Sequence, residues 1–112
     1  MTVTEICPLD ALEDGGAKGF NLDIDGERTA VFLIRQGDAV RAYVNECPHI
    51  LVPLNARPDA FLSPDGARIM CSNHRAEFLI DDGRCVSGPC IGDRLKVLPV
   101  GVLDGRVFLI SG

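Results

Sequence analysis

Two short segments, each pairing a cysteine with a histidine, constrain this chain most strongly. They are Cys47-Pro48-His49 and Cys71-Ser72-Asn73-His74, and 21 residues lie between them. The chain has only two histidines, and both stand in these segments. Thiolate sulfur and neutral imidazole nitrogen are both common metal ligands. The pattern therefore predicts that the fold brings the two segments together around a metal centre.

The mixed pairing bears on which metal is bound. Two cysteines and two histidines can hold a tetrahedral zinc ion, which would make the chain a structural zinc-binding interaction module. Structural zinc sites, however, usually take like ligands in pairs: two close cysteines, then two close histidines. A [2Fe-2S] cluster with two sulfurs on one iron and two nitrogens on the other needs one ligand of each kind from each loop. The pairing therefore favours a cluster held by Cys47, His49, Cys71 and His74.

These segments, read as C-P-H-I and C-S-N-H-R-A-E-F, resemble the ligand loops of the Rieske iron–sulfur family. The resemblance continues through Gly83 and the Ser87-Gly88-Pro89 turn to Phe108. It implies one Rieske [2Fe-2S] cluster and a Rieske-type antiparallel β-sandwich base. On that base we expect a small cluster-binding subdomain of two ligand loops, over approximately residues 45–90. Both histidines are expected at its exposed tip.

Strand-forming runs separated by turn residues also predict an all-β chain. We expect strands over residues 2–9, 18–24, 28–35, 39–45, 94–102 and 107–111, while helical periodicity is almost absent. Asp25-Gly26 and Asp104-Gly105 are strong hairpin signals. At 112 residues, the chain is expected to be a single Rieske domain over residues 1–112. Phe20, Phe32 and Phe108 are candidates for its core.

The interval between the ligand segments, residues 50–70, contains Pro53, Pro58 and Pro64, which argue against a long regular element. A short turn over residues 54–60 is compatible with this composition. By comparison with many ferredoxin-like members, the interval looks a few residues longer. It is either a docking loop for a specific partner or a tolerated surface insertion.

Leu51 and Arg75 depart from the family pattern, because a glycine is usual after each histidine. Glycine there allows a close approach of the backbone and unusual dihedral angles. A bulkier Leu51 would shield the cluster from water. Arg75 would either place a positive charge near the cluster or be no more than an exposed side chain.

The resemblance also predicts a low reduction potential. In the high-potential respiratory branch, a serine and a tyrosine after the second histidine donate hydrogen bonds to cluster sulfurs, but here Ala76 and Phe78 stand at these positions. That branch also joins its loops by a disulfide, whereas Val52 and Asn73 occupy the matching positions. Hydrogen bonds to sulfur stabilise the more negative, reduced form, so their absence lowers the potential.

Three cysteines remain: Cys7, Cys85 and Cys90. By resemblance, Cys85 and Cys90 flank a third loop that packs against the cluster. They could form a disulfide, but we favour buried thiols, because a cytoplasmic chain is normally kept reduced. Cys7 is expected to pack as a small hydrophobic residue.

Composition and charge exclude some classes of binding partner. The net charge of −5 argues against nucleic acid and anionic membranes. It would serve either docking to a basic partner or ordinary solubility. Residues 1–20 carry no signal-peptide pattern, and no run approaches the roughly 20 apolar residues that span a bilayer. We therefore expect a cytoplasmic protein.

The resemblance implies an electron-transfer protein that catalyses nothing alone. It would pass single electrons from a flavin-dependent reductase to a terminal Rieske oxygenase, as the ferredoxin components of aromatic-ring dioxygenases do. Such docking is transient and small. The alternative is a small subunit of an NAD(P)H nitrite reductase, which would be held permanently in a complex.

Overall fold

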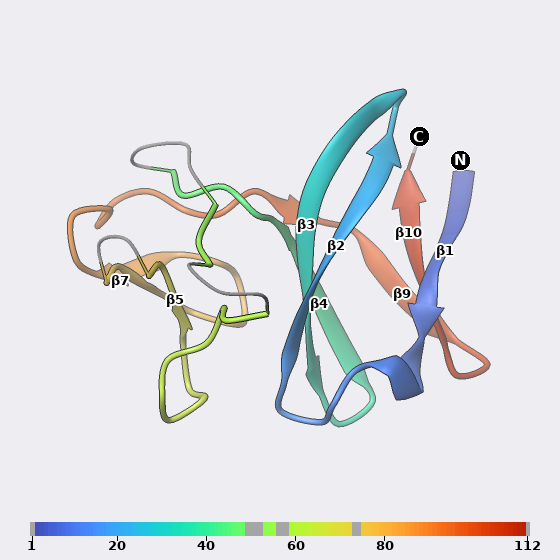
Figure 1. Ribbon diagram of the computed structural model, residues 1–112, viewed down its shortest axis with the longest axis horizontal. Coiled ribbons are helices and arrows are strands. Elements are labelled where there is room, and N and C mark those ends of the chain that lie inside the picture. Colours follow the sequence, from blue (N-terminus) through green and yellow to red (C-terminus); the bar gives the residue numbers. More distant parts are fainter. Residues whose placement is uncertain (1, 49–52, 56–58, 73–74, 112) are drawn as a thin grey trace.

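The regular secondary structure is made of antiparallel strands, apart from one short 3-10 helix (Figure 1). The computed structural model describes residues 2–48, 53–55, 59–72 and 75–111. In these ranges there is no α-helix, which confirms the all-β prediction, and no helix that could cross a membrane. The elements are β1 (Thr2–Pro8), the 3-10 helix η1 (Leu9–Ala11), β2 (Ala17–Ile24), β3 (Glu27–Gln36), β4 (Ala39–Val44), β5 (Ile69–Met70), β6 (Glu77–Phe78), β7 (Cys85–Ser87), β8 (Val97–Leu98), β9 (Val100–Leu103) and β10 (Arg106–Ser111).

Two of the three sheets form the base, on the right of Figure 1. One has the strand order β1-β10-β9 and the other β2-β3-β4-β8. Their apolar faces meet in a cluster that includes Cys7, Leu33 and Val107. Cys7 packs there as a small hydrophobic residue, as expected, and burial raises the pKa of its thiol. The two ends of the chain therefore pair with each other and close the sandwich.

Strand β3 is buried on both faces. Its residues 31–34 are each 1% exposed or less. Successive side chains of a strand point to opposite faces. Val31 and Leu33 accordingly lie in the core of the base, whereas Phe32 and Ile34 lie in a second core. That second core, which we call the loop core, also contains Cys47, Cys71, Cys85 and Cys90. Strand β3 therefore connects the base to the part of the molecule that carries the candidate ligands.

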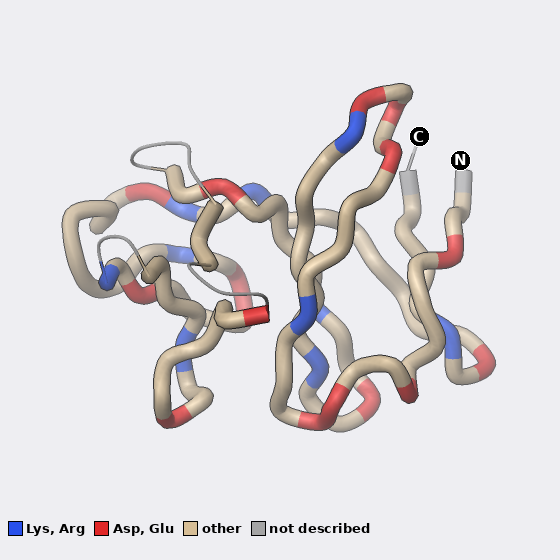
Figure 2. Tube along the Cα trace, viewed as in Figure 1, with Lys and Arg blue, Asp and Glu red and all other residues tan. Residues whose placement is uncertain are grey.

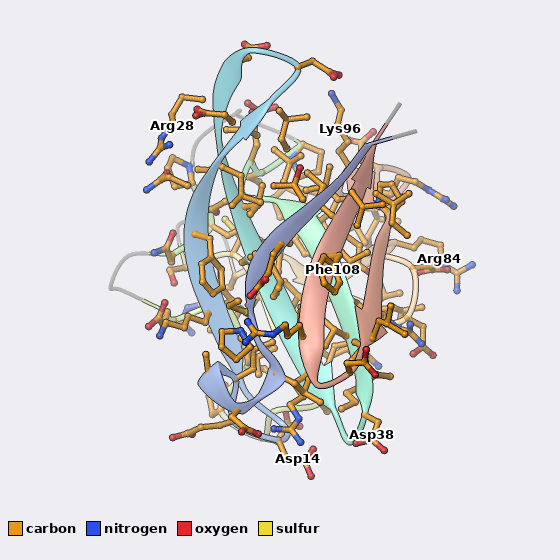
Figure 3. The ribbon with its side chains drawn as sticks, turned by 90° about the vertical axis from the view of Figure 1, so that its right-hand side faces the viewer. Asp14, Arg28, Asp38, Arg84, Lys96 and Phe108 are labelled. Carbon is orange, nitrogen blue, oxygen red and sulfur yellow. The ribbon has the colours of Figure 1, made fainter. Side chains whose placement is uncertain are left out.

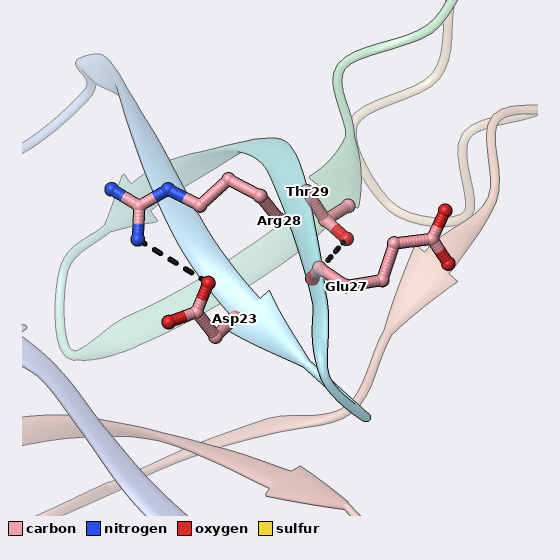
Figure 4. Close-up of polar contacts among 4 residues, drawn as sticks. All are labelled: Asp23, Glu27, Arg28 and Thr29. Carbon is pink, nitrogen blue, oxygen red and sulfur yellow. Dashed lines mark hydrogen bonds and ion pairs between the residues drawn. The ribbon is translucent and has the colours of Figure 1, made fainter.

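Both Asp-Gly pairs make the hairpin turns that the sequence predicts. Asp25 and Gly26 have φ angles of 52° and 82°, and Asp104 and Gly105 have 52° and 71°. Positive φ at both turn residues is the geometry that a tight hairpin needs. Beside the first turn, Arg28 pairs with Asp23 at 3.4 Å and the Thr29 hydroxyl donates to a carbonyl (Figure 4). The ion pair is exposed, so the turn geometry determines this hairpin more than the charges do.

The predicted strand over residues 94–102 is wrong as one element. The chain forms β8 and β9 instead, with Pro99 between them. Strand β8 pairs with β4 in one sheet, whereas β9 pairs with β10 in the other. Proline has no N–H to donate and interrupts a ladder. The chain therefore crosses from one sheet to the other at Pro99.

Two of the three phenylalanines proposed for the core are only half-buried. Phe32 is fully buried, but Phe20 and Phe108 are of intermediate exposure. Val107 and Leu109 face the core of the base, so Phe108 between them must face outward. Figure 3 shows its ring on the outer side of β10.

The third sheet, β5-β6-β7, lies beside the base, on the left of Figure 1. The interval before it is partly core, which the sequence did not predict: Leu54 and Phe61 are fully buried. The Phe61 ring stacks on Phe32 with 4.5 Å between centroids and 9° between planes. The described part of this interval is therefore anchored to the base. The expected turn over residues 54–60 lies partly outside the described residues.

Candidate functional site

The two candidate cysteine ligands follow strands of different sheets and are buried in the same core. Cys47 comes three residues after β4, and Cys71 comes directly after β5. Both are 0% exposed and belong to the loop core. His49 and His74, the other two predicted ligands, lie outside the described residues, as do Leu51, Val52 and Asn73. The predicted exposed tip therefore stays a prediction.

A short polar bridge connects the two cysteine loops. The Asn45 side chain donates to the Asn55 side-chain oxygen at 2.9 Å and accepts from the Leu54 N–H at 2.8 Å. The Ser72 N–H then donates to the Leu54 carbonyl at 2.8 Å. The segment after Cys47 is thereby bonded both to the end of β4 and to the residue after Cys71. Sequence reasoning missed this bridge, because isolated asparagines in a loop carry no distinctive signal.

The second cysteine loop is closed by its own backbone. The Cys71 N–H donates to the Ala76 carbonyl at 2.9 Å, and the Arg75 N–H donates to the Cys71 carbonyl at 2.8 Å. Arg75 has a φ angle of +58°, in the left-handed region. This position therefore uses the unusual dihedral angle for which the family's glycine is suited. The Arg75 side chain is exposed.

A third loop, residues 85–93, packs against the other two. Gly88, at φ +93°, lies so close to Ala76 that a Cβ on the glycine would be 2.8 Å from the Ala76 Cα. Cys90 is fully buried, and its sulfur lies 3.7 Å from that of Cys47. Cys85 is also buried, and its thiol donates to the Ser87 carbonyl at 3.3 Å. The third loop thus packs against both loops that carry the candidate cysteines.

Tyr43 supports the third sheet from the base. Its ring is fully buried, and its hydroxyl donates to the Ile80 carbonyl at 2.6 Å. Burial raises the pKa of this phenol to about 12. Gly83, at φ +76°, lets the backbone approach the ring, since a Cβ there would lie 2.8 Å from the Tyr43 Cε1. The hairpin that carries the third loop is therefore fixed against β4.

The donor chemistry of the described residues fits an iron–sulfur group. Two buried thiols stand on adjoining loops, in a core that also includes Ala76 and Phe78. Thiolates are the usual protein ligands of iron–sulfur iron, and apolar surroundings restrict the access of water. In the described ranges, no three histidine, cysteine or acidic side chains are grouped as a metal site, and both histidines lie outside these ranges.

In the view of Figure 2, the charged residues that the structure describes are spread over the whole molecule. Figure 2 shows acidic residues at hairpin tips and loops of both the base and the smaller part, which carries β5, β6 and β7, with Lys and Arg between them. Of the two interpretations of the net charge, this distribution favours ordinary solubility over a dedicated acidic face.

Comparison with known proteins gives one family and several similar structures. The family model for the Rieske [2Fe-2S] domain matches residues 2–100. The ferredoxin of carbazole 1,9a-dioxygenase from Nocardioides aromaticivorans IC177 superposes with a TM-score of 0.77 and 24% identity, over 100% of both chains. The terminal oxygenase of that enzyme, from the same organism, gives 0.75 and 28%, over 98% of this chain and 30% of the oxygenase chain.

A third similar structure is that of a protein assigned as the small subunit of an NADPH nitrite reductase. It has a TM-score of 0.70 and 22% identity, over 99% of this chain and 100% of that chain. No curated protein sequence matches the chain. At these identities, the ferredoxin and the nitrite reductase subunit are evidence for the fold alone.

Proposed function

Because the chain belongs to the Rieske [2Fe-2S] domain family, we propose that it is a one-electron carrier whose cluster ligands are Cys47, His49, Cys71 and His74. The family match makes a [2Fe-2S] cluster its cofactor, and the zinc alternative thereby loses its support. The observation that most supports the ligand assignment is the burial of both Cys47 and Cys71 in one core, on loops joined through Leu54. We further propose that residues 45–90 form the cluster-binding subdomain of a single domain.

The cluster, when bound, supplies reversible one-electron chemistry. The chain's own contribution is to hold the ligands still. The backbone bonds that close the Cys71–Ala76 turn, the Asn45–Leu54 bridge and the contact of Gly88 with Ala76 each restrict one loop. Loops that do not rearrange on reduction suit a carrier, because little reorganisation then accompanies each electron.

We propose a potential in the lower part of the Rieske range, which runs roughly from −150 to +300 mV. Ala76 and Phe78 are both fully buried, and neither side chain has a hydrogen-bond donor. The site therefore lacks the two hydroxyl donors of the high-potential branch. Protein-film voltammetry of the loaded protein is expected to give a midpoint at or below roughly 0 mV. A midpoint well above this value would contradict the proposal.

The partners that we propose are a flavin-dependent reductase and a terminal Rieske oxygenase. The match with the ferredoxin of carbazole 1,9a-dioxygenase, over 100% of both chains, supports partners of this kind. The equally complete match with a nitrite reductase small subunit keeps the second function open. A cytoplasmic location stays a prediction from the sequence.

Two measurements separate these functions. The protein, loaded anaerobically with iron and sulfide, is mixed with a flavin reductase and NADH, and the visible absorption of the cluster is followed. A carrier is expected to be bleached on reduction and to regain its colour when an oxygenase is added. Gel filtration with a nitrite reductase large subunit is expected to show no stable complex. A stable complex would support the subunit function, and a colourless protein after loading would contradict both.

A further inference from the structure

The third loop places a second sulfur beside a proposed cluster ligand. The Sγ atoms of Cys90 and Cys47 lie 3.7 Å apart, and both residues are fully buried. This distance is within the range of a sulfur hydrogen bond, and between two thiols either could be the donor. A cysteine that ligates iron is a thiolate and has no proton to donate. When Cys47 acts as a ligand, a hydrogen bond between the two sulfurs therefore has Cys90 as its donor.

The backbone holds Cys90 at this position. The Cys90 carbonyl accepts from the Asp93 N–H at 2.8 Å, and the Asp93 carbonyl accepts from the Cys85 N–H at 3.0 Å. Gly88, two residues earlier, rests on Ala76. A loop restrained at both ends cannot easily carry the thiol away from Cys47. The contact is therefore part of the folded structure around the site.

We propose that Cys90 is a positioning residue that raises the reduction potential by donating an S–H···S hydrogen bond to Cys47. This inference rests on the proposed function, because it needs Cys47 as a ligand thiolate. A hydrogen bond to a ligand sulfur stabilises the reduced, more negative site more than the oxidised one. On reduction, the site gains one electron from the flavin reductase; no bond forms or breaks, and the proton stays on Cys90.

The effect is expected to be modest, because a thiol is a weak donor. The hydrogen bond from Cys90 would offset part of the decrease in potential that follows from having Ala76 and Phe78 in place of two hydroxyl donors. No signal in the sequence alone shows that Cys90, rather than Cys85, is the cysteine beside a ligand. The assignment depends on the distance that the fold sets.

The test compares Cys90→Ala and Cys90→Ser with the wild-type holoprotein by protein-film voltammetry. Loss of the donor in Cys90→Ala is expected to lower the equilibrium constant for one-electron reduction by a factor of roughly three to ten. That factor lowers the midpoint by about 30–59 mV for a one-electron couple. Serine keeps a donor, so Cys90→Ser is expected at or above the wild-type potential. A mere packing role would shift both variants alike, since both side chains are smaller than cysteine.

Cys85→Ala is the matched control. Cys85 is a buried cysteine of the same loop, 4% exposed, but its thiol donates to the Ser87 carbonyl and not to a ligand sulfur. Its removal is expected to leave the midpoint within experimental error. An equal shift in Cys85→Ala and Cys90→Ala would assign the effect to loop packing and overturn the inference.

The remaining outcomes distinguish the two proposals. A wild-type protein that takes up no cluster contradicts the proposed function itself. A loaded Cys90→Ala variant with the wild-type midpoint contradicts only the inference about Cys90. Should Cys90→Ala fail to load, Cys90→Ser decides, because a midpoint below that of the wild type would contradict donation from this position.

Discussion

Gly88 shows how much of the site depends on single backbone positions. Its φ of +93° is strained for any residue with a side chain, and the Ala76 Cα occupies the space that a Cβ would need. Ala76 closes the turn that begins at Cys71. The position of the third loop is therefore tied, through one glycine, to the loop of a proposed ligand.

We predict that Gly88→Ala lowers the free energy of unfolding by about 2–4 kcal/mol, from backbone strain together with the steric contact. Gly92→Ala is the control, since Gly92 has a similar φ of +102° but nothing within 4 Å of its built Cβ. It should show the strain alone, about 1–2 kcal/mol. Urea unfolding of both variants measures these changes. Equal losses of unfolding free energy would show that the close contact of Gly88 with Ala76 contributes nothing to the effect.

Titration of Tyr43 is expected to make the free energy of unfolding depend on pH in the alkaline range. It is the only tyrosine in a chain without tryptophan, so tyrosinate absorbance reports this residue alone. Its pKa in the folded protein is raised to about 12 by burial, above the unfolded value near 10. The protonated phenol therefore stabilises the fold below pH 10, and this contribution, roughly 2 kcal/mol, is lost as the pH rises to 12.

Tyr43→Phe should remove this part of the alkaline loss of stability. It should also lower the free energy of unfolding at neutral pH by about 1 kcal/mol, through loss of the bond to the Ile80 carbonyl. Spectrophotometric titration together with urea unfolding measures both effects. Titration of the native wild-type protein near pH 10 would contradict the burial of the hydroxyl.

At the scale of elements, β3 and the interval before β5 form one packed unit. Phe32 projects from β3 into the loop core, where the Phe61 ring covers it. Gly19 on β2 makes room for that ring and donates its N–H to the Asp59 carboxylate at 2.8 Å. The described part of the interval between the two ligand loops is therefore held against the base by aromatic stacking and by a hydrogen bond from the Gly19 backbone.

Phe61→Ala should consequently lower the free energy of unfolding by about 3–5 kcal/mol, through loss of buried area and creation of a cavity. Phe108→Ala, which truncates the same residue type on the outer side of β10, is expected to lose about 1–2 kcal/mol. Thermal or urea unfolding compares the two. Losses of equal size would indicate that the interval is not part of the core.

Local signals explain which elements the sequence could predict. The two Asp-Gly hairpins and β3 follow from turn chemistry and strand propensity within a few residues. The crossing between sheets at Pro99 depends on which distant strands are partners, and a single run of residues carries no such information. The burial of Phe61 and the Asn45 bridge depend likewise on contacts between distant segments.

For the candidate site, the limit was similar. The Cys-His spacing is local, so two short segments were enough to predict the [2Fe-2S] cofactor, which the family match confirms, and to propose its ligands. The close approach of Cys90 to Cys47 joins residues 43 positions apart and needed the fold. Arg75 was predictable in part. The glycine that is usual at this position in the family indicates a left-handed backbone, which Arg75 adopts, but it does not indicate where an arginine side chain would lie.

On the scale of the whole molecule, the fold has two cores that share one strand. The base pairs the two ends of the chain and has its own core, whereas the smaller part contains the loop core with its four cysteines (Figure 1). Strand β3 contributes to both cores.

Electron paramagnetic resonance of the reduced, iron-loaded protein tests the proposed cluster and its four ligands. The proposed ligands predict a rhombic signal with hyperfine coupling to two histidine nitrogens, seen by electron–nuclear double resonance. His49→Ala or His74→Ala should abolish this signal. A reduced protein whose signal carries no nitrogen coupling, or which binds only a single colourless ion, would contradict ligation of a [2Fe-2S] cluster by these residues.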